Sequence, residues 1–519
     1  MATTTEETAV LAEDALGMDG VVRDAVCHDL KRSTTRGALV SLVGQSANFV
    51  LRTGSMVIMA RLLTPKDFGL VGMVAAVTGF LGLFRDLGLS MATVQRDSVT
   101  NAQTSTLFWI NVAVGGGLAL MCVLLAPALA AFYSEPRLFW VTAASGTSFL
   151  FNGAAAQHRA ILQRGMRFLP LAIIDIVSLV SSLAAGVGMA LADTGYWALV
   201  AAAVCQQAMS LAGVCCATRW IPGRFQRRSG VRSMLWFGGT VTLNSVIAFL
   251  AYNIDKVLVG RFYGAEALGV YGRAFQLINL PTENLTSTIG LVAFPALARV
   301  QNEPSRLRNY FIKGYSSSLS LVLPITVACA LFSEDIVSVF LGAKWQEAAP
   351  IFRLLAPTIL AFAVVNPFGW LMLATGRAGR SLKIGLVIAP VVVLGYVLGL
   401  RYGPRGVAVG FSASMVTSVV PLALWAKRGT LITTADLLAA VMRPGLSVVI
   451  GAAATLPARG VLGLVHPVFF RLALETALLS GVYLLVLLFV FKQKEAYAQL
   501  LREAGLWPSR GNGRTDQST

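Results

Sequence analysis

Charged side chains are scarce in this chain, and histidine is almost absent. Only 13% of the 519 residues are Asp, Glu, Lys or Arg, whereas 56% are hydrophobic, and there are 3 histidines. A water-soluble domain typically carries about 25% charged residues, which cover its surface. A chain of this composition cannot cover such a surface, so lipid must be its solvent. The sequence therefore predicts a membrane protein and excludes a soluble globular domain.

The chain also lacks the motifs of familiar metal, nucleotide and nucleophile sites. All of its 6 cysteines except Cys27 lie inside apolar runs without metal-ligand spacing, so we expect them to pack as small hydrophobic residues. No Gly-rich loop ending in Gly-Lys occurs, which argues against ATP hydrolysis by this chain. None of His28, His158 and His466 neighbours a nucleophile motif. The sequence therefore predicts no enzymatic activity, no metal and no cofactor.

The two ends of the chain lack long apolar runs. Residues 1–38 begin acidic, as at Glu6, and become basic, as at Lys31, and they have no apolar core of the kind that a signal peptide carries. We therefore expect a cytosolic N-terminal extension at 1–38 and a cytosolic tail at 493–519.

Long apolar runs dominate the sequence between these ends. A helix that crosses the hydrocarbon core of a bilayer needs about 20 apolar residues, and fourteen runs approach that length. The sequence thus predicts an all-α, polytopic membrane protein with about 14 transmembrane helices. The runs lie near 39–60, 68–89, 107–131, 138–157, 168–191, 196–217, 235–259, 268–297, 314–332, 352–375, 384–400, 406–426, 441–457 and 472–491.

The distribution of positive charge predicts the orientation of these helices. If the N-terminus is cytosolic, 28 of the 42 Lys and Arg residues lie in cytosolic segments, ten lie in outer segments, and the remaining four fall within spans. Cytosolic loops of membrane proteins carry such an excess of Lys and Arg. We therefore expect both termini in the cytosol and a location in the cytoplasmic membrane. The same bias accounts for most of the net charge of +17 without a nucleic-acid partner.

Part of the chain repeats itself at an offset of 200 residues. ARLLTPKDFGLVGM, from Ala60, aligns without gaps with GRFYGAEALGVYGR, from Gly260, and this alignment pairs Gly69 with Gly269. Six spans repeated in the same orientation predict two parallel six-helix bundles, related by a pseudo-twofold axis along the membrane normal. The expected organisation is an N-terminal six-helix bundle at 39–217, a C-terminal six-helix bundle at 235–426, and two extra transmembrane helices at 437–492.

Several segments resemble those of a known family. ARLLTPKDFGLVGM and FRDLGLS, with NIDKVLVGRFYG, YGRAFQLINLP, AFPALARVQ and LGAKWQEAAPIFRLL, are similar to the oligosaccharide flippase family over about Arg36 to Arg428. That family is the polysaccharide-transporter branch of an exporter superfamily that also contains multidrug antiporters. The resemblance implies two bundles that alternate between inward and outward openings. It also implies a polyprenyl-diphosphate-linked oligosaccharide substrate, for lipopolysaccharide or exopolysaccharide biosynthesis.

Polar and basic residues within the spans are candidates for contact with such a substrate. A diphosphate needs cations and a sugar needs hydrogen-bonding groups, and an unpaired charge is costly inside a membrane. Gln45, Asn48 and Arg52 recur every three or four residues, as one stripe of the first helix. We expect these three residues, with Lys256 and Arg273, to bind the diphosphate and sugar. The alternative is a structural hydrogen-bond seam in which Arg52 pairs with a buried carboxylate. For Lys256, which lies about one turn below the outer end of its helix, the alternative is snorkelling to the interface or an ion pair.

Acidic residues within the spans are candidates for ion coupling or gating. Burial makes a carboxylate easier to protonate, so Glu283 and Asp175 are candidate proton sites, and Asp255 belongs to a weaker polar set near the outer end of its helix. For Glu283 the alternative is a structural ion pair with an arginine. Arg85 and Asp86, at the cytosolic end of the second span, are expected to form an interfacial pair that closes an inner gate.

The expected function is translocation of a lipid-linked oligosaccharide unit by alternating access. Membrane lipid surrounds the protein, and a polysaccharide polymerase and chain-length proteins are candidate partners. One alternative is an ion-coupled multidrug antiporter, whose site would favour buried carboxylates over arginine. Another is a membrane-embedded polysaccharide polymerase or acyltransferase, which would be expected to carry a sizeable outer loop or an intramembrane histidine, and the sequence shows neither.

Overall fold

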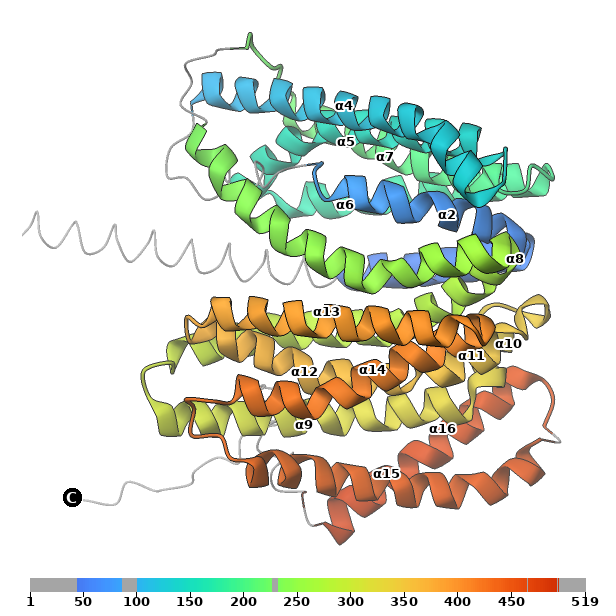
Figure 1. Cartoon of the computed structure of the whole chain (residues 1–519), viewed down its shortest axis with the longest axis vertical. Coiled ribbons are helices and arrows are strands. Elements are labelled where there is room, and N and C mark those ends of the chain that lie inside the picture. The colour runs from blue at the N-terminus through green and yellow to red at the C-terminus, as the bar shows by residue number, and fades with distance from the viewer. Residues whose placement is uncertain (1–43, 86–99, 226–231, 464, 492, 494–519) are drawn as a thin grey trace, which may run out of the picture. The chain divides into compact units, whose positions relative to one another are not determined.

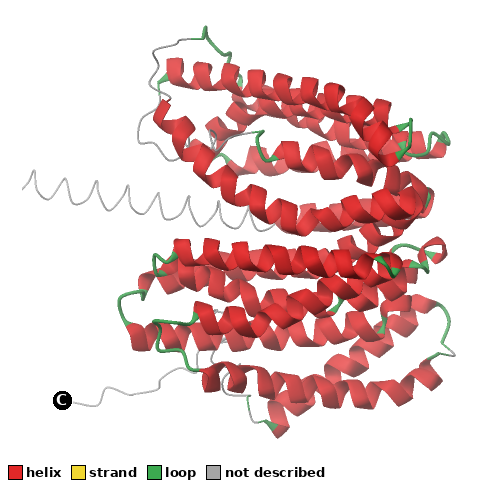
Figure 2. Cartoon of the chain, viewed as in Figure 1, coloured by secondary structure: helices red, strands yellow, loops and turns green. Residues whose placement is uncertain are grey.

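The computed structural model describes residues 44–85, 100–225, 232–463, 465–491 and 493. Within those ranges every regular element is helical and no strand occurs, as Figure 2 shows. Nine of the described helical segments are long and apolar enough to cross a membrane. The prediction of an all-α, polytopic membrane protein is therefore confirmed.

Short connections join the helices along the chain (Figure 1). The first described helix covers residues 44–62. The others are α2 (Pro65–Gly82), α4 (Asn101–Tyr133), α5 (Leu138–Arg164), α6 (Phe168–Leu191), α7 (Trp197–Thr218), α8 (Arg232–Arg299), α9 (Pro304–Leu331), α10 (Ser333–Phe340), the 3-10 helix η1 (Ala343–Trp345), α11 (Ala348–Leu355), α12 (Pro357–Ala374), α13 (Ala378–Leu400), α14 (Gly403–Ala426), α15 (Thr434–Leu462), α16 (Val468–Leu485) and the π-helix η2 (Val486–Val490).

The long helix α8 contains two of the predicted spans. Its backbone leaves the helical conformation at Gly264, where φ is +81° and ψ is −176°. Glycine adopts such a positive φ without the steric cost that a Cβ brings. Gly264 therefore divides α8 into two arms, which correspond to the predicted spans at 235–259 and 268–297.

The chain forms two compact units. Unit 1 contains the described residues of Met1–Thr64 and Val74–Val246, and unit 2 contains those of Pro65–Met73 and Ile247–Thr519. The helix α2 therefore begins in unit 2 and ends in unit 1.

Glycines allow close packing of helices in unit 1. A Cβ at Gly115 of α4 would lie 2.5 Å from the carbonyl oxygen of Phe149 in α5. A Cβ at Gly153 of α5 would lie equally close, 2.5 Å, to the carbonyl oxygen of Asn111 in α4. Small residues at such crossings let two backbones approach, which is a common way of packing helices in membranes.

Close packing at glycines also joins α13 to α14 in unit 2. A Cβ at Gly399 would lie 2.1 Å from the carbonyl oxygen of Gly406, and one at Gly410 would lie 2.0 Å from that of Gly395. On each helix the two glycines are four residues apart, so they lie on one face. The two faces therefore meet backbone to backbone.

The two segments that repeat at an offset of 200 residues also cross in unit 2. A Cβ at Gly69 would lie 1.6 Å from the carbonyl oxygen of Ala265, and a Cβ at Gly269 would lie 1.8 Å from that of Pro65. The contact is reciprocal at the same offset, because both pairs of positions are equivalent in the repeat. A two-fold relation between two copies of one motif produces such a contact. At this crossing the two copies of the motif are therefore related by a local two-fold axis, and the relation between whole bundles stays a prediction.

A proline in α9 leaves a carbonyl that α16 satisfies. Pro324 has no N–H, so the carbonyl of Ser320, four residues earlier, has no helical donor. The hydroxyl of Tyr483 in α16 donates a hydrogen bond to that oxygen at 2.7 Å. This bond joins the last helix to the interior of unit 2.

Candidate substrate and ion sites

The polar stripe predicted on the first helix lies in unit 1. Gln45 and Arg52 are exposed and Asn48 is half-buried. The same helix face is buried further along, at Met56 and Met59, so Arg52 lies where the exposed half of this face meets the buried half. Arg52 has no hydrogen-bond or ion-pair partner among the described residues. Its guanidinium is therefore available to an anion.

The predicted proton site at Asp175 is engaged in an ion pair. Asp175 of α6 accepts a hydrogen bond from the guanidinium of Arg159 in α5. The same guanidinium lies 3.4 Å from the hydroxyl of Ser210 in α7. The pair therefore links three helices of unit 1. The sequence did not predict this ion pair. Arg159 follows the predicted span at 138–157 and was therefore counted as a loop residue, whereas α5 extends to Arg164.

Three further predicted residues have no established partner. Arg85 is exposed in the turn after α2, and Asp86 lies outside the described residues, so their gating pair stays a prediction. Glu283 is exposed on α8. No ion pair joins Glu283 to an arginine in the part of the chain that the structure describes. Its role in ion coupling also stays a prediction.

Asp255 is the most deeply buried of the predicted acidic residues. It is 0% exposed, within the first arm of α8. The hydroxyl of Tyr271, on the second arm, donates a hydrogen bond to its Oδ2 at 2.8 Å. Its Oδ1 and the buried hydroxyl of Tyr396 in α13 both lack a partner among the described residues. A buried carboxylate with one unsatisfied oxygen is a place where a proton or a small cation can bind. No contact of Asp255 with either tyrosine was predicted from the sequence.

The two predicted cations of unit 2 lie against aromatic rings. The Nζ of Lys256 lies 4.8 Å from the ring centre of Phe275 and donates a hydrogen bond to Asn253 at 2.7 Å. The guanidinium carbon of Arg273 lies 3.7 Å from the ring centre of Phe68. Both positive charges are stabilised by neutral groups. No carboxylate pairs with either of them within the described ranges.

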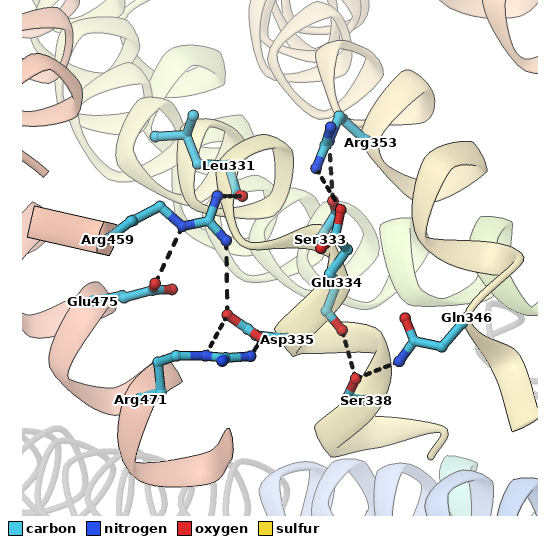
Figure 3. Close-up of polar contacts among 10 residues, drawn as sticks. All are labelled: Leu331, Ser333, Glu334, Asp335, Ser338, Gln346, Arg353, Arg459, Arg471 and Glu475. Atoms are coloured by element: carbon cyan, nitrogen blue, oxygen red, sulfur yellow. Dashed lines mark hydrogen bonds and ion pairs between the residues drawn. The ribbon is translucent and has the colours of Figure 1, made fainter. Parts of the chain in front are cut away.

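A cluster of charged residues joins α10 to α15 and α16 (Figure 3). Both carboxylate oxygens of Asp335 in α10 accept hydrogen bonds from Arg471 in α16. Arg459 of α15 lies 3.8 Å from Asp335 and 3.2 Å from Glu475 of α16. Arg459 also donates a hydrogen bond to the carbonyl oxygen of Leu331 at 2.8 Å. The cluster thus connects three helices and the end of α9.

Burial and balanced charge make this cluster a structural anchor. The side chains of Asp335 and Glu475 are only 3% and 1% exposed. Two arginines balance two carboxylates, as buried charges require. None of these four residues was among the predicted site residues, although each lies at or near the end of an apolar run.

A comparison with known families identifies the chain. A family model described as "Polysaccharide biosynthesis protein" matches residues 58–350. The chain belongs to this family. The match contains the glycine crossing of the repeat, at Gly69 and Gly269, and it confirms the resemblance to polysaccharide transporters that the sequence motifs indicate.

Two bacterial proteins are among the relatives of this polysaccharide biosynthesis protein. One is the teichuronic acid biosynthesis protein TuaB of Bacillus subtilis (strain 168), with 29% identity over 334 residues. The aligned residues cover 63% of this chain and 68% of TuaB. The other is the lipopolysaccharide biosynthesis protein WzxC of Escherichia coli (strain K12), with 25% identity over 401 residues. The aligned residues cover 75% of this chain and 80% of WzxC.

Solved structures with the same fold are transporters. The lipid II flippase MurJ, in its inward closed conformation, is similar over 90% of this chain and 99% of the MurJ chain, with a TM-score of 0.71 and 13% identity. A multidrug resistance transporter of the MATE family, in its inward-facing conformation, is similar over 75% of this chain and 97% of the transporter chain, with a TM-score of 0.60 and 14% identity. At these identities the likeness shows the fold alone.

Proposed function

We propose that this chain translocates a polyprenyl-diphosphate-linked oligosaccharide unit across the cytoplasmic membrane for the synthesis of a cell-surface polysaccharide. It works as a transporter and not as an enzyme. Family membership supports this proposal, as do the relatives named for teichuronic acid and lipopolysaccharide biosynthesis. The fold is compatible with a lipid-linked substrate, because a lipid II flippase has the same fold.

The topology and partners proposed with this function come from the sequence. Both termini are cytosolic, since Lys and Arg are concentrated on that side. Six-helix bundles at 39–217 and 235–426 are followed by two further helices at 437–492. A polysaccharide polymerase and chain-length proteins receive the translocated unit.

The observation that carries the proposal is the unpaired arginine of the first helix. A cation without a counter-charge is costly in a membrane segment and marks a functional site. Arg52 has such a position, exposed on its helix and without a partner among the described residues. A diphosphate supplies the negative charge that is missing, and Asn48 and Gln45, about one and two helical turns away on the same stripe, are further hydrogen-bonding groups.

Replacing Arg52 by alanine is expected to reduce export by roughly tenfold or more. A charge-assisted hydrogen bond contributes about 1.5–3 kcal/mol, and about 1.4 kcal/mol corresponds to a tenfold change. Arg52→Lys keeps the charge but loses the bidentate fork, so we expect an intermediate rate. The measurement is the amount of lipid-linked repeat units that accumulates in cells lacking the native gene and expressing each variant.

Gly54→Ala is the matched control, because a Cβ at Gly54 of the same helix meets nothing within 4 Å. Normal export by Arg52→Ala, or normal polysaccharide export in cells that lack the gene altogether, would contradict the proposal. If Arg52→Ala instead changes sensitivity to a panel of cationic drugs, the antiporter alternative is favoured.

We further propose that Asp255 takes up the coupling ion. Replacing it by asparagine keeps its shape and removes its charge, so export is expected to fall more than tenfold, because moving one elementary charge across about 100 mV is worth about 2.3 kcal/mol. The measurement is export with and without proton and sodium gradients. Glu266→Gln is the control, since Glu266 is an exposed acid on the same helix. Gradient-driven export by Asp255→Asn at the parental rate would remove Asp255 from the mechanism.

A further inference from the structure

Basic side chains gather where two connections of unit 2 meet. One connection joins α12 to α13, and the other joins α14 to α15. The guanidinium of Arg377, in the first connection, donates hydrogen bonds at 2.9 Å to the carbonyl oxygens of Arg428 and Gly429, in the second. Arg380, at the start of α13, donates a further hydrogen bond to the carbonyl oxygen of Arg428. Two guanidinium groups therefore share one oxygen atom.

A glycine makes room for one of these groups. Gly429 has a φ of +79°, and a Cβ there would lie 3.0–3.3 Å from three atoms of the guanidinium of Arg377. A side chain at this position would strain the backbone and crowd the guanidinium. The second connection is thus shaped to hold the arginine of the first.

These cations lack counter-charges in the part of the chain that the structure describes. No carboxylate there pairs with Arg377, Arg380 or Arg428. The acid nearest to Arg428 along the chain is Asp436 of α15, and both of its carboxylate oxygens already accept hydrogen bonds from Arg308 of α9. Like charges repel at short range, so an anion from outside these residues would stabilise the arrangement.

An apolar surface continues from the cations along α13. Lys383 is exposed one turn after Arg380, and one turn further Leu386 and Val387 are 50% and 55% exposed. Residues three and four positions apart lie on one face of a helix. This face therefore presents positive charge at the start of α13 and aliphatic side chains further along. A phospholipid has the same order, with a charged headgroup followed by acyl chains.

We define the basic cluster as Arg377, Arg380, Lys383 and Arg428. We propose that the basic cluster binds the headgroup of an anionic phospholipid, with an acyl chain along the exposed aliphatic face of α13. In the topology proposed above both connections face the cytosol, and anionic lipids of that leaflet attract basic residues beside the membrane. The planar fork of an arginine matches two phosphate oxygens. A bias of positive charge toward the cytosol accounts for the number of these cations, whereas a bound phosphate also accounts for their convergence.

Two lipids that differ in net charge test the proposal. Dioctanoyl phosphatidylglycerol and dioctanoyl phosphatidylcholine carry the same acyl chains, and native mass spectrometry measures their binding to the full-length protein in neutral detergent. We expect the anionic lipid to bind about tenfold more tightly, which is about 1.4 kcal/mol. The double variant Arg377→Gln/Arg380→Gln should lose most of this preference. Lys383→Gln changes an exposed side chain, so it should fold like the parent and lower the affinity for the anionic lipid severalfold.

The matched control removes equal charge from the other end of the same helix pair. Arg401 follows α13 and Arg405 lies in the first turn of α14, and both are exposed. Arg401→Gln/Arg405→Gln should therefore keep the preference for the anionic lipid. Equal loss in the two double variants would show that net charge alone sets the preference, and would overturn the site.

Inorganic phosphate separates a lipid site from a site for free anions. We expect it to compete weakly with phosphatidylglycerol, because it has no acyl chain to lie along α13. Full displacement of the lipid by inorganic phosphate at equal concentration would overturn the proposal. So would equal affinity of the parent for the two lipids, or an unchanged preference in both Arg377→Gln/Arg380→Gln and Lys383→Gln.

Discussion

Alanine at position 269 is expected to abolish export, although it adds a single methyl group. A Cβ at Gly269 would lie 1.8 Å from the carbonyl oxygen of Pro65, and a backbone oxygen cannot rotate away as a side chain can. An extra methyl group in a well-packed interior lowers the stability of the folded state by about 1–3 kcal/mol and occasionally more. We expect a loss at or above the upper end of that range, because the atom in the way belongs to the backbone. The measurement is export in cells, together with the amount of folded protein recovered in detergent.

The neighbouring glycine provides the control for this prediction. A Cβ at Gly272, less than one helical turn further along α8, meets nothing within 4 Å, so Gly272→Ala should retain export. The equivalent change in the other repeat, Gly69→Ala, places a Cβ 1.6 Å from the carbonyl oxygen of Ala265 and should be as harmful as Gly269→Ala. Because both changes affect one crossing, the double variant should be less damaging than the sum of the two single variants. Full additivity, or normal export by Gly269→Ala, would refute the close crossing.

Replacing Asp335 by alanine is expected to destabilise the protein by about 3–5 kcal/mol. That is the range for removing one member of a buried ion pair, which leaves the opposite charge uncompensated. Here Arg471 and Arg459 both lose a carboxylate that is 3% exposed. The expected result is a marked loss of monodisperse protein after mild heating in detergent. The measurement is size-exclusion chromatography after a series of heating steps.

A surface ion pair in the same segment serves as the control. Arg353 lies 3.2 Å from Glu334, with side chains that are 48% and 63% exposed. Exposed pairs contribute about 0–1 kcal/mol, so Glu334→Ala, which leaves the hydrogen bond of Arg353 to Ser333 in place, should be close to the parent. Equal heat resistance of Asp335→Ala and Glu334→Ala would show that the buried cluster is not an anchor.

Local patterns predicted the helices well, because membrane-spanning segments are encoded by continuous apolar runs. The predicted run at 168–191 has the same bounds as α6, and that at 196–217 differs by one residue from α7. The region near 333–350 was expected to be a loop, but it contains α10, η1 and the start of α11. Those helices are short and polar on one side, so hydropathy does not reveal them.

The partners of the polar residues could not be predicted in the same way. Asp255 was a candidate from its position, but its bond to Tyr271 depends on how the two arms of α8 face each other. The contact of Arg273 with Phe68 joins residues 205 positions apart, and that of Arg471 with Asp335 joins residues 136 positions apart. Periodicity along a helix gives the face of a residue, whereas the group opposite that face is set by tertiary packing.

The hydrogen bond from Tyr483 of α16 to Ser320 of α9 predicts which residues change together among related proteins. Without Tyr483, the carbonyl oxygen of Ser320 would lose the hydrogen bond that stands in for the one that Pro324 cannot donate. A homologous transporter built from twelve helices would therefore have to give up the proline at position 324, or replace the phenol with another donor. Tyr483 of α16 thus accompanies the proline in α9, and we expect this proline and this tyrosine to be gained or lost together across the family.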